Sequence, residues 1–232
     1  MNSTLQQPRP LAVLPPAVLG AALGSLPPDL GAQVLKGCVE WTVPAGRMLL
    51  PQGQRADVCY GLATGLLRLD RDDANGRSLV LDLLEPGRWV GCTHVLADAP
   101  LPFGVTTVTR STLLVLRKST LQSLLEGRPG DTVAWLLAVA AAQADGLVAQ
   151  LGMLATGSVE ERVGWLLRVL AERHSVPVGG FRRILVPLTQ TQMARIVGAS
   201  RQRVNTTLGM LRRQGQLRIV GGWLELAGTT KG

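Results

Sequence analysis

Residues 189–213 read TQTQMARIVGASRQRVNTTLGMLRR. Thr189 and Gln192 have the spacing of a capping box, in which each side chain hydrogen-bonds the backbone N–H of the other residue. This pattern predicts a helix over about Gln190–Val197. Gly198 follows at once and can adopt the left-handed backbone conformation that ends a helix. The stretch therefore predicts a helix, a tight turn and a second helix.

The second helix is expected over about Arg201–Arg213, with Ser200 as its N-cap and Gly215 just past its end. Its apolar residues recur at i, i+4 and i+7, which is the spacing of one buried stripe. They are Val204, Leu208 and Leu211. The polar residues at its N-terminal end are suited to hydrogen-bond base edges in a major groove of DNA. These base-reading candidates are Arg201, Gln202, Asn205 and Thr206.

A second group of residues is expected to contact DNA phosphates, aided by the two helix N-termini. It comprises Arg203 and three hydroxyl residues, Thr189, Thr191 and Ser200. A hairpin over 217–226 with a Gly221-Gly222 turn follows, so the whole segment predicts a winged helix-turn-helix. The alternative interpretation is an ordinary helical hairpin with a polar outer face.

The charge distribution favours DNA binding over that alternative. The chain has 24 Lys+Arg and 16 Asp+Glu, a formal net charge of +8. Residues 1–180 contain 15 basic and 15 acidic residues, whereas residues 181–232 contain nine basic residues and one acid, Glu225. A neutral body joined to a small basic domain indicates a polyanionic partner, here double-stranded DNA.

Composition excludes several other classes. The 232 residues are 46% apolar and 17% charged, which fits a soluble globular protein of one or two domains. The longest apolar run, about Ala134–Ala142, is shorter than the ~20 residues that span a bilayer, and the N-terminus lacks a secretory pattern. Cys38, Cys59 and Cys92 form neither a disulfide framework nor a zinc motif, and only two histidines are present. We therefore expect a cytoplasmic protein with no membrane contact and no metal site.

Residues 39–116 have the pattern of an all-β domain. Short runs rich in Val, Leu and Thr alternate with glycines, and 65–70 and 78–84 are expected strands. Asn75-Gly76 between them predicts a tight turn. Strands of this length and spacing predict an antiparallel β-barrel or jelly roll. A short helix is expected before it, over 29–36.

A long helix is expected after Pro129 and Gly130. Its apolar and small residues recur at spacings of four and three, a heptad pattern. They are Val133, Leu137, Ala140, Ala144, Leu147, Leu151 and Leu154. We interpret this stripe as the seam of a homodimer; the alternative is packing on the chain's own barrel. Thr156-Gly157 has the character of a hinge, and Ser158 begins a further capping box.

These patterns predict an α+β fold in three parts. Residues 1–128 are expected to contain the β-barrel, 129–157 a dimerisation helix and hinge, and 158–232 the winged helix-turn-helix.

The chain resembles the CRP/FNR family of bacterial transcription regulators over about residues 20–227. The matching barrel positions are Val43-Pro-Ala-Gly46, Gly53, Tyr60-x4-Gly65, Asn75-Gly-Arg77 and Leu84-Glu-Pro-Gly87-x3-Gly91. The matching C-terminal positions are Leu188-Thr189, Ile196-Val-Gly-Ala-Ser-Arg201, Val204 and Leu208. The resemblance implies a cyclic-nucleotide-binding-type barrel and regulation of transcription rather than catalysis. Its implied partners are DNA, a second copy of the chain, RNA polymerase and a small-molecule effector.

The expected effector pocket departs from the pattern of family members that bind cyclic AMP. Those members carry a Glu after the glycine matching Gly91 and an Arg-Ser pair in the following loop, where this chain has Cys92 and Pro102-Phe103. A buried phosphate without its arginine costs several kcal/mol, so we predict that cyclic nucleotides do not bind tightly. The expected pocket residues are Gly91, Cys92, His94, Pro102 and Phe103, and no cofactor follows from them.

Three alternatives stay open. A haem or redox sensor could use Cys92 and His94, because the carbon-monoxide-sensing haem member of the family carries Cys-x-His in this region; a buried thiol and a hydrogen-bonded imidazole is the simpler interpretation. The barrel could instead be a platform without effector. A cupin-type enzyme needs several histidines in the barrel, and residues 39–116 contain one.

The recognition helix also departs from the pattern of the best-known family members. Gln202 lacks the carboxylate that they carry at this position, so we expect an altered base preference in a pseudo-palindromic operator.

Overall fold

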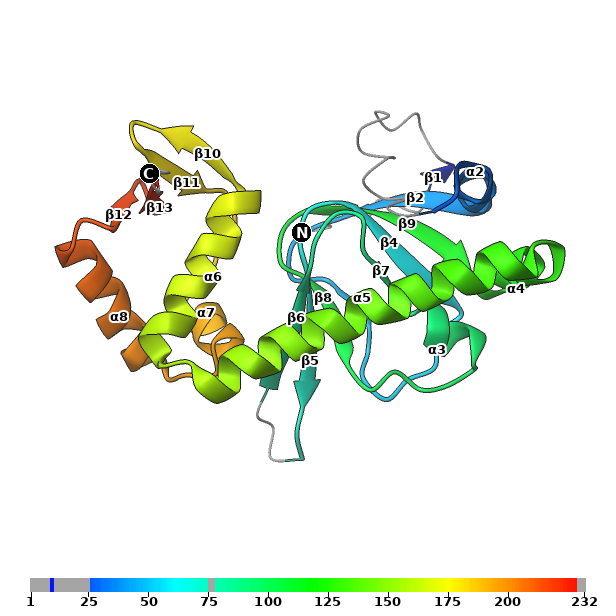
Figure 1. Cartoon of the computed structure of the whole chain (residues 1–232), viewed down its shortest axis with the longest axis horizontal. Helices are drawn as coiled ribbons and strands as arrows, with labels where there is room; N and C mark the ends of the chain where they lie inside the picture. The colour runs from blue at the N-terminus through cyan, green and yellow to red at the C-terminus, as the bar shows by residue number, and fades with distance from the viewer. Residues whose placement is uncertain (1–8, 11–25, 75–77, 229–232) are drawn as a thin grey trace, which may run out of the picture. The chain divides into compact units, whose positions relative to one another are not determined.

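The computed structural model describes residues 9–10, 26–74 and 78–228 (Figure 1). The Asn75-Gly76 turn lies outside these residues. Contacts divide the chain into two units, of which the first ends at Val148 and the second begins at Ala149. This division falls inside the long helix α5 (Pro129–Thr156), which therefore belongs to both units.

The first unit contains two antiparallel sheets, as expected for a jelly-roll barrel. The larger has the order β1 (Arg9–Pro10), β2 (Cys38–Val43), β9 (Ser111–Arg117), β4 (Val58–Thr64) and β7 (Trp89–Val90). The smaller has the order β3 (Met48–Leu50), β8 (Gly104–Thr107), β5 (Leu67–Asp72) and β6 (Ser78–Leu84).

Both faces of the larger sheet are buried, which explains why its strands are apolar almost throughout. Along β9, Leu113 and Val115 point into the core between the two sheets. Leu114 and Leu116 point the other way, into a second core beneath the helices. Side chains alternate along a strand, so one apolar run supplies two cores.

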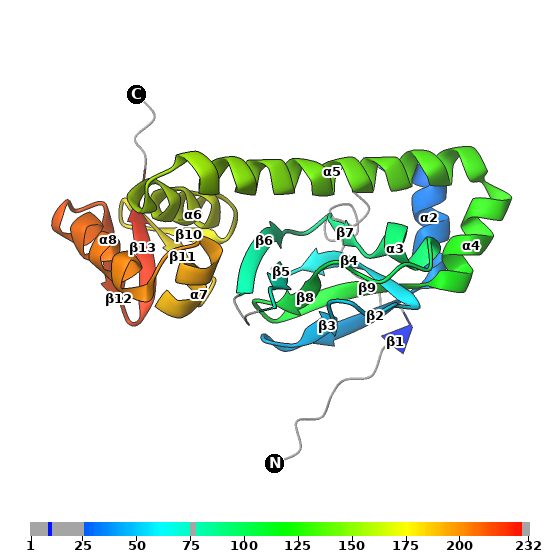
Figure 2. The ribbon, with the colours of Figure 1, turned by 90° about the horizontal axis from the view of Figure 1, so that it is seen from below.

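Helices cover the outer face of the larger sheet. They are α2 (Pro28–Gly37), α3 (Cys92–Leu96), α4 (Lys118–Gly127) and the first part of α5. Figure 2 shows α5 running past β7 and α3 in this unit. Trp135, Leu136 and Val139 are the residues of α5 that enter this core.

The apolar part of helix α5 is longer than the run Ala134–Ala142 that the sequence analysis considered. The helix has 28 residues, and an 18-residue window reaches a mean hydropathy of 1.5 with 17% of that window buried, so its length and composition would suffice to cross a membrane. The sequence analysis counted only the uninterrupted run Ala134–Ala142 and missed this, because Gln143 and Asp145 interrupt the run but not the helix. The helix thus carries an apolar surface that the described chain leaves largely open.

The second unit contains the predicted helix-turn-helix and one four-stranded sheet. Its helices are α6 (Val159–Arg173), α7 (Gln190–Ile196) and α8 (Arg201–Arg213). Its sheet has the order β10 (Ser175–Val178), β11 (Phe181–Ile184), β13 (Trp223–Ala227) and β12 (Leu217–Val220). The sequence analysis did not predict the β10–β11 hairpin. Gly179 and Gly180 both have positive φ and form its turn.

Candidate nucleic-acid interface

The turn between α7 and α8 is built as the sequence predicts. The backbone N–H of Gln192 donates to Oγ1 of Thr189 at 3.2 Å, and the N–H of Thr189 donates to Oε1 of Gln192 at 2.8 Å. Gly198 has a φ of 59°, a conformation that favours glycine, and a Cβ there would lie only 3.0 Å from a terminal methyl of Leu154. The N–H of Arg203 donates to Oγ of Ser200 at 3.2 Å and caps α8.

Helix α8 presents the expected two faces. Val204 and Leu208 of the predicted stripe are buried together with Thr207, whereas Leu211 is only half-buried. The residues predicted to face DNA are exposed, and they are Arg201, Gln202, Arg203, Asn205 and Thr206. The structure therefore brings all four base-reading candidates together at the N-terminal end of one helix face.

Hydrogen bonds within the helix-turn-helix determine which donors and acceptors some of these side chains can present to DNA. Thr206 donates its hydroxyl proton to the carbonyl of Gln202 at 3.0 Å, so it presents a methyl group and an oxygen acceptor. Asn205 accepts a hydrogen bond at Oδ1 from Nε2 of Gln190 at 3.1 Å. The sequence reading missed Gln190, because a contact between two helices has no local signature.

The phosphate candidates differ in the same way. Thr189 also donates its hydroxyl proton to Oε1 of Gln192 at 3.0 Å, so its cap already uses that proton. Ser200 only accepts in its cap, which leaves its own proton available to a phosphate oxygen. Thr191 and Arg203 are exposed.

The single acid of residues 181–232 is used inside the domain. Glu225 is fully buried and lies 2.7 Å from Arg183 and 2.5 Å from Arg218. The hydrogen bond from Arg218 lowers the pKa of this carboxyl, against the effect of burial. The arginines left exposed on α7 and α8 are Arg195, Arg201, Arg203, Arg212 and Arg213. No acidic side chain therefore lies on the helix-turn-helix to repel DNA.

Comparison with known proteins agrees with this architecture. A cyclic nucleotide-binding domain model matches residues 40–128, and a Crp-like helix-turn-helix domain model matches residues 161–227. The CRP-like cAMP-activated global transcriptional regulator of Mycobacterium tuberculosis is 29% identical over 178 residues, covering 77% of this chain and 79% of that protein. The cyclic AMP receptor protein of Thermus thermophilus is 26% identical over 185 residues, covering 79% and 81%.

The chain belongs to the CRP/FNR family. It is thus a DNA-binding transcription regulator rather than an enzyme. The structure of the c-di-GMP responsive global regulator CLP from Xanthomonas campestris has the same fold. Its TM-score is 0.71 at 22% identity, with 87% of this chain and 99% of that chain covered.

Two residues expected to form the effector pocket of this regulator, Cys92 and Phe103, lie in different cores. Cys92 is 1% exposed and belongs to the core beneath the helices, whereas Phe103 belongs to the core between the sheets. Pro102 is exposed. The ring of His94 lies edge-on to Phe103 at 5.7 Å, and burial lowers the pKa of this imidazole. Gly91 has a φ of 89° and caps α3.

The thiols of the regulator are set deep in the fold. All three are buried in the core beneath the helices: Cys38, Cys59 and Cys92. Burial raises the pKa of Cys38 to about 12. A hydrogen bond with Cys92, together with burial, raises the pKa of Cys59 well above its usual range. The thiols of Cys38 and Cys59 are therefore protonated and poorly nucleophilic. The described residues hold no group of three or more His, Cys, Asp or Glu side chains suited to a metal ion.

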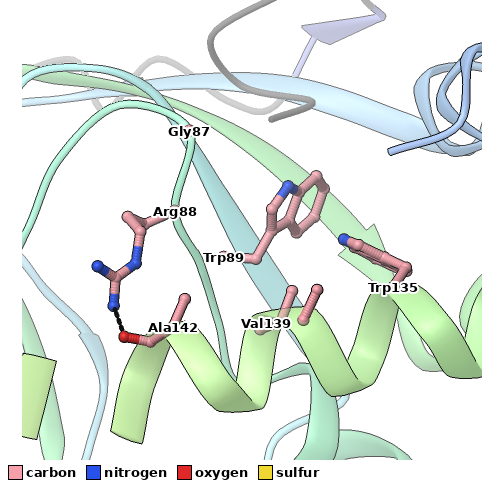
Figure 3. Close-up of a pocket in the computed structure, with 7 residues that line it drawn as sticks. Gly87, Arg88, Trp89, Trp135, Val139 and Ala142 are labelled. Atoms are coloured by element: carbon pink, nitrogen blue, oxygen red, sulfur yellow. Dashed lines mark hydrogen bonds between the residues drawn. The ribbon is translucent and has the colours of Figure 1, made fainter. Parts of the chain in front are cut away.

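A small cavity lies elsewhere in the first unit, between β7 and α5 (Figure 3). Its volume is about 60 Å³, and Trp89 and Trp135 meet edge to face beside it at 5.3 Å. Nη2 of Arg88 donates to the carbonyl oxygen of Ala142 in α5 at 2.6 Å. A Cβ at position 61 would lie 2.6 Å from the Trp89 indole, so Gly61 makes room for it. Ligand pockets typically reach several hundred Å³, so this cavity does not hold a nucleotide.

The predicted seam on α5 is mostly open in the single chain. Among its residues Val133, Leu137, Ala144 and Leu151 are exposed. The other three, Ala140, Leu147 and Leu154, are half-buried. Val148, which the heptad reading left out, is 68% exposed, and Leu137 is 65% exposed.

Proposed function

We propose that this regulator is a cytoplasmic homodimer that reads a pseudo-palindromic operator through the N-terminal face of α8. One observation carries the proposal. Five polar side chains at the start of α8 are exposed, while Val204 and Leu208 of the same helix are buried and fix its rotation. The positive end of the helix dipole and the nearby arginines favour the approach of a phosphate backbone.

The side chains divide into two roles. The guanidinium of Arg201 can donate two hydrogen bonds to O6 and N7 of guanine in the major groove, and Gln202 and Asn205 can read further base edges. The methyl group of Thr206 can pack on a thymine methyl. Arg203, Thr191 and Ser200 hold phosphates and set the register of the helix. The hydroxyl proton of Thr189 is donated to Oε1 of Gln192, so a phosphate contact through that proton requires this one hydrogen bond to break.

The exposed face of α5 supports the homodimer. An apolar stripe with small residues such as Ala144 suits close packing of two helices. A two-fold dimer presents two copies of α8, so the half-sites should lie about one helical turn of DNA apart, ~34–36 Å. RNA polymerase and a small-molecule effector are the further partners that membership of the family suggests.

Selection from a random duplex library tests the proposal directly. We expect purified protein to enrich inverted repeats whose half-site centres are about 10 base pairs apart. Enrichment of a single, non-repeated site would contradict the two-fold arrangement, and no enrichment at all would contradict sequence-specific reading by α8.

We also propose that cyclic AMP is not the effector, although the relatives from M. tuberculosis and T. thermophilus are named for it. The positions expected to receive the nucleotide hold a buried thiol, Cys92, and a buried ring, Phe103. Neither can compensate a phosphate charge. Calorimetry should detect no binding of cyclic AMP at micromolar concentration, with the M. tuberculosis regulator as positive control. A micromolar dissociation constant would overturn this part of the proposal.

A regulator without effector is the second candidate. It is favoured by the side chains that fill the space between the sheets, among them Leu62, Leu113 and Phe103. The haem or redox alternative has less support, because Cys92 and His94 lie against different cores. Mass spectrometry of the purified protein separates the candidates, since a co-purifying small molecule would contradict the effector-free one.

A further inference from the structure

Gln190 of α7 contacts the base-reading side of α8. Its Nε2 lies 3.1 Å from Oδ1 of Asn205 and donates to it. Gln190 is the first residue of α7, directly after the capping Thr189, so the capping box fixes its backbone. Asn205 is exposed on the face that we assign to base reading.

This hydrogen bond determines which end of the Asn205 amide faces outward. A carboxamide has an acceptor end, Oδ1, and a donor end, the Nδ2 amino group. With Oδ1 turned to Gln190, the amino group is the end left for another partner. Pairing with adenine requires both ends, because the amide oxygen must accept from N6 while the amino group donates to N7.

We propose that Gln190 is a positioning residue for base recognition, which holds the Asn205 amide with its donors toward the DNA. The base opposite Asn205 is then chosen for acceptors in the major groove, as guanine offers at O6 and N7, over adenine. This inference rests on the proposed function, in which Asn205 faces a base.

The hydrogen bond between Gln190 and Asn205 contributes little to the stability of the domain. Gln190 and Asn205 are joined by an exposed hydrogen bond, and such bonds contribute little to stability because water replaces them readily. The helix pair already has its own anchors in the buried residues Met193, Ala194 and Leu208. An effect of Gln190 should therefore appear in base preference and not in folding.

The experiment compares base preference at every operator position for four proteins: the wild type, Gln190→Met, Gln190→Glu and Asn205→Ala. Gln190→Met keeps the length of the side chain but removes its donors, and it should reduce the preference for guanine over adenine at one position by about tenfold. Gln190→Glu offers only acceptors, so it should turn the amino group inward. Its preference at that position should then move to a base that presents a donor.

Two controls separate this inference from the proposed function. In an Asn205→Ala background, Gln190→Met should change nothing further at that position, as expected for residues that act through one another. Thermal unfolding of Gln190→Met should match the wild type.

If Asn205→Ala loses preference at a position where Gln190→Met keeps it, the inference about Gln190 is overturned alone. If Asn205→Ala has no effect at any position, the base-reading role of Asn205 falls, and this part of the proposed function falls with it.

Discussion

Glu225 is the single acidic residue among residues 181–232, and it neutralises two arginines inside the C-terminal domain. It is fully buried between Arg183 and Arg218, and the guanidinium of Arg218 also lies over the ring of Phe181 at 3.9 Å. Its pKa lies below the ordinary value of 4.5. A carboxyl whose pKa is lowered by folding stabilises the native state above its unfolded pKa. That stabilisation is lost as the pH falls through the folded pKa.

Replacement of Glu225 by Gln should therefore have an effect that depends on pH. At pH 7 the variant should be less stable than the wild type, because two arginines lose their ionised partner. As the pH falls below about 4.5, the carboxyl of the unfolded wild-type chain takes up a proton first, so the difference should shrink until the pH is also below the lowered pKa of the folded carboxyl. Urea unfolding at a series of pH values measures this, and a difference that stays constant from pH 7 to pH 3 would contradict it.

At the same scale, one hydrogen bond changes what a predicted phosphate-contact side chain can donate. Thr189 and Ser200 are both predicted phosphate contacts. In the structure, the hydroxyl of Thr189 donates its proton to Gln192, whereas the hydroxyl of Ser200 only accepts a hydrogen bond and can still donate. The capping residues follow from spacing, but the direction of a hydroxyl proton depends on a neighbour's side chain.

Among the elements, α5 makes two close polar contacts with the barrel in addition to its buried apolar residues. Arg88 donates to the carbonyl of Ala142, and Asp82 lies where a Cβ on Gly146 would be. Burial raises the pKa of Asp82, against the opposing effect of Arg88. A glycine inside a helix ordinarily costs ~1 kcal/mol relative to alanine, and here it permits this close approach.

Two glycines of α5 therefore provide a matched comparison. Gly152→Ala should stabilise the protein by about 0.5–1 kcal/mol, because a Cβ there meets nothing within 4 Å. Gly146→Ala should destabilise it, and the loss should be reduced in an Asp82→Ala background. Denaturant unfolding of the variants provides the free energies. Equal stabilisation by both alanines would contradict the proposed contact.

The open face of α5 makes a separate prediction about assembly. Leu137→Glu should weaken the dimer by about 100-fold or more, because an unpaired carboxylate in an apolar seam costs several kcal/mol. Folding should be unaffected, since Leu137 is 65% exposed in the single chain. Sedimentation velocity measures the effect, with Gln122→Glu on the exposed face of α4 as the control. A Leu137→Glu protein that still sediments as a dimer would place the interface elsewhere.

For the whole molecule, the separation of charge along the chain is the sequence feature that most clearly predicts the DNA-binding domain. Nine basic residues against one acid beyond residue 180, combined with two caps around Gly198, predict the helix-turn-helix and its exposed face. The alternation of strands also predicts the barrel. These features could be predicted because they depend on local spacing, capping and composition.

The division of the barrel side chains between two cores could not be predicted from the sequence. Cys92 and Phe103 are eleven positions apart and face different cores, whereas Arg88 and Trp135 meet beside a cavity from distant parts of the chain. Neither the assignment of these side chains to a core nor the cavity can be predicted from the spacing of residues along the sequence. The contact between Gln190 and Asn205 is hidden for the same reason.

The most direct test of the account compares Arg201→Ala with Arg203→Ala on the selected operator and on variants of it, over a range of salt concentrations. Arg201→Ala should cost about 1–3 kcal/mol and relax preference at one base position. Arg203→Ala should weaken binding to every sequence alike and reduce the salt slope by about one. If both variants lose the same affinity on every sequence, α8 does not read bases in the way proposed.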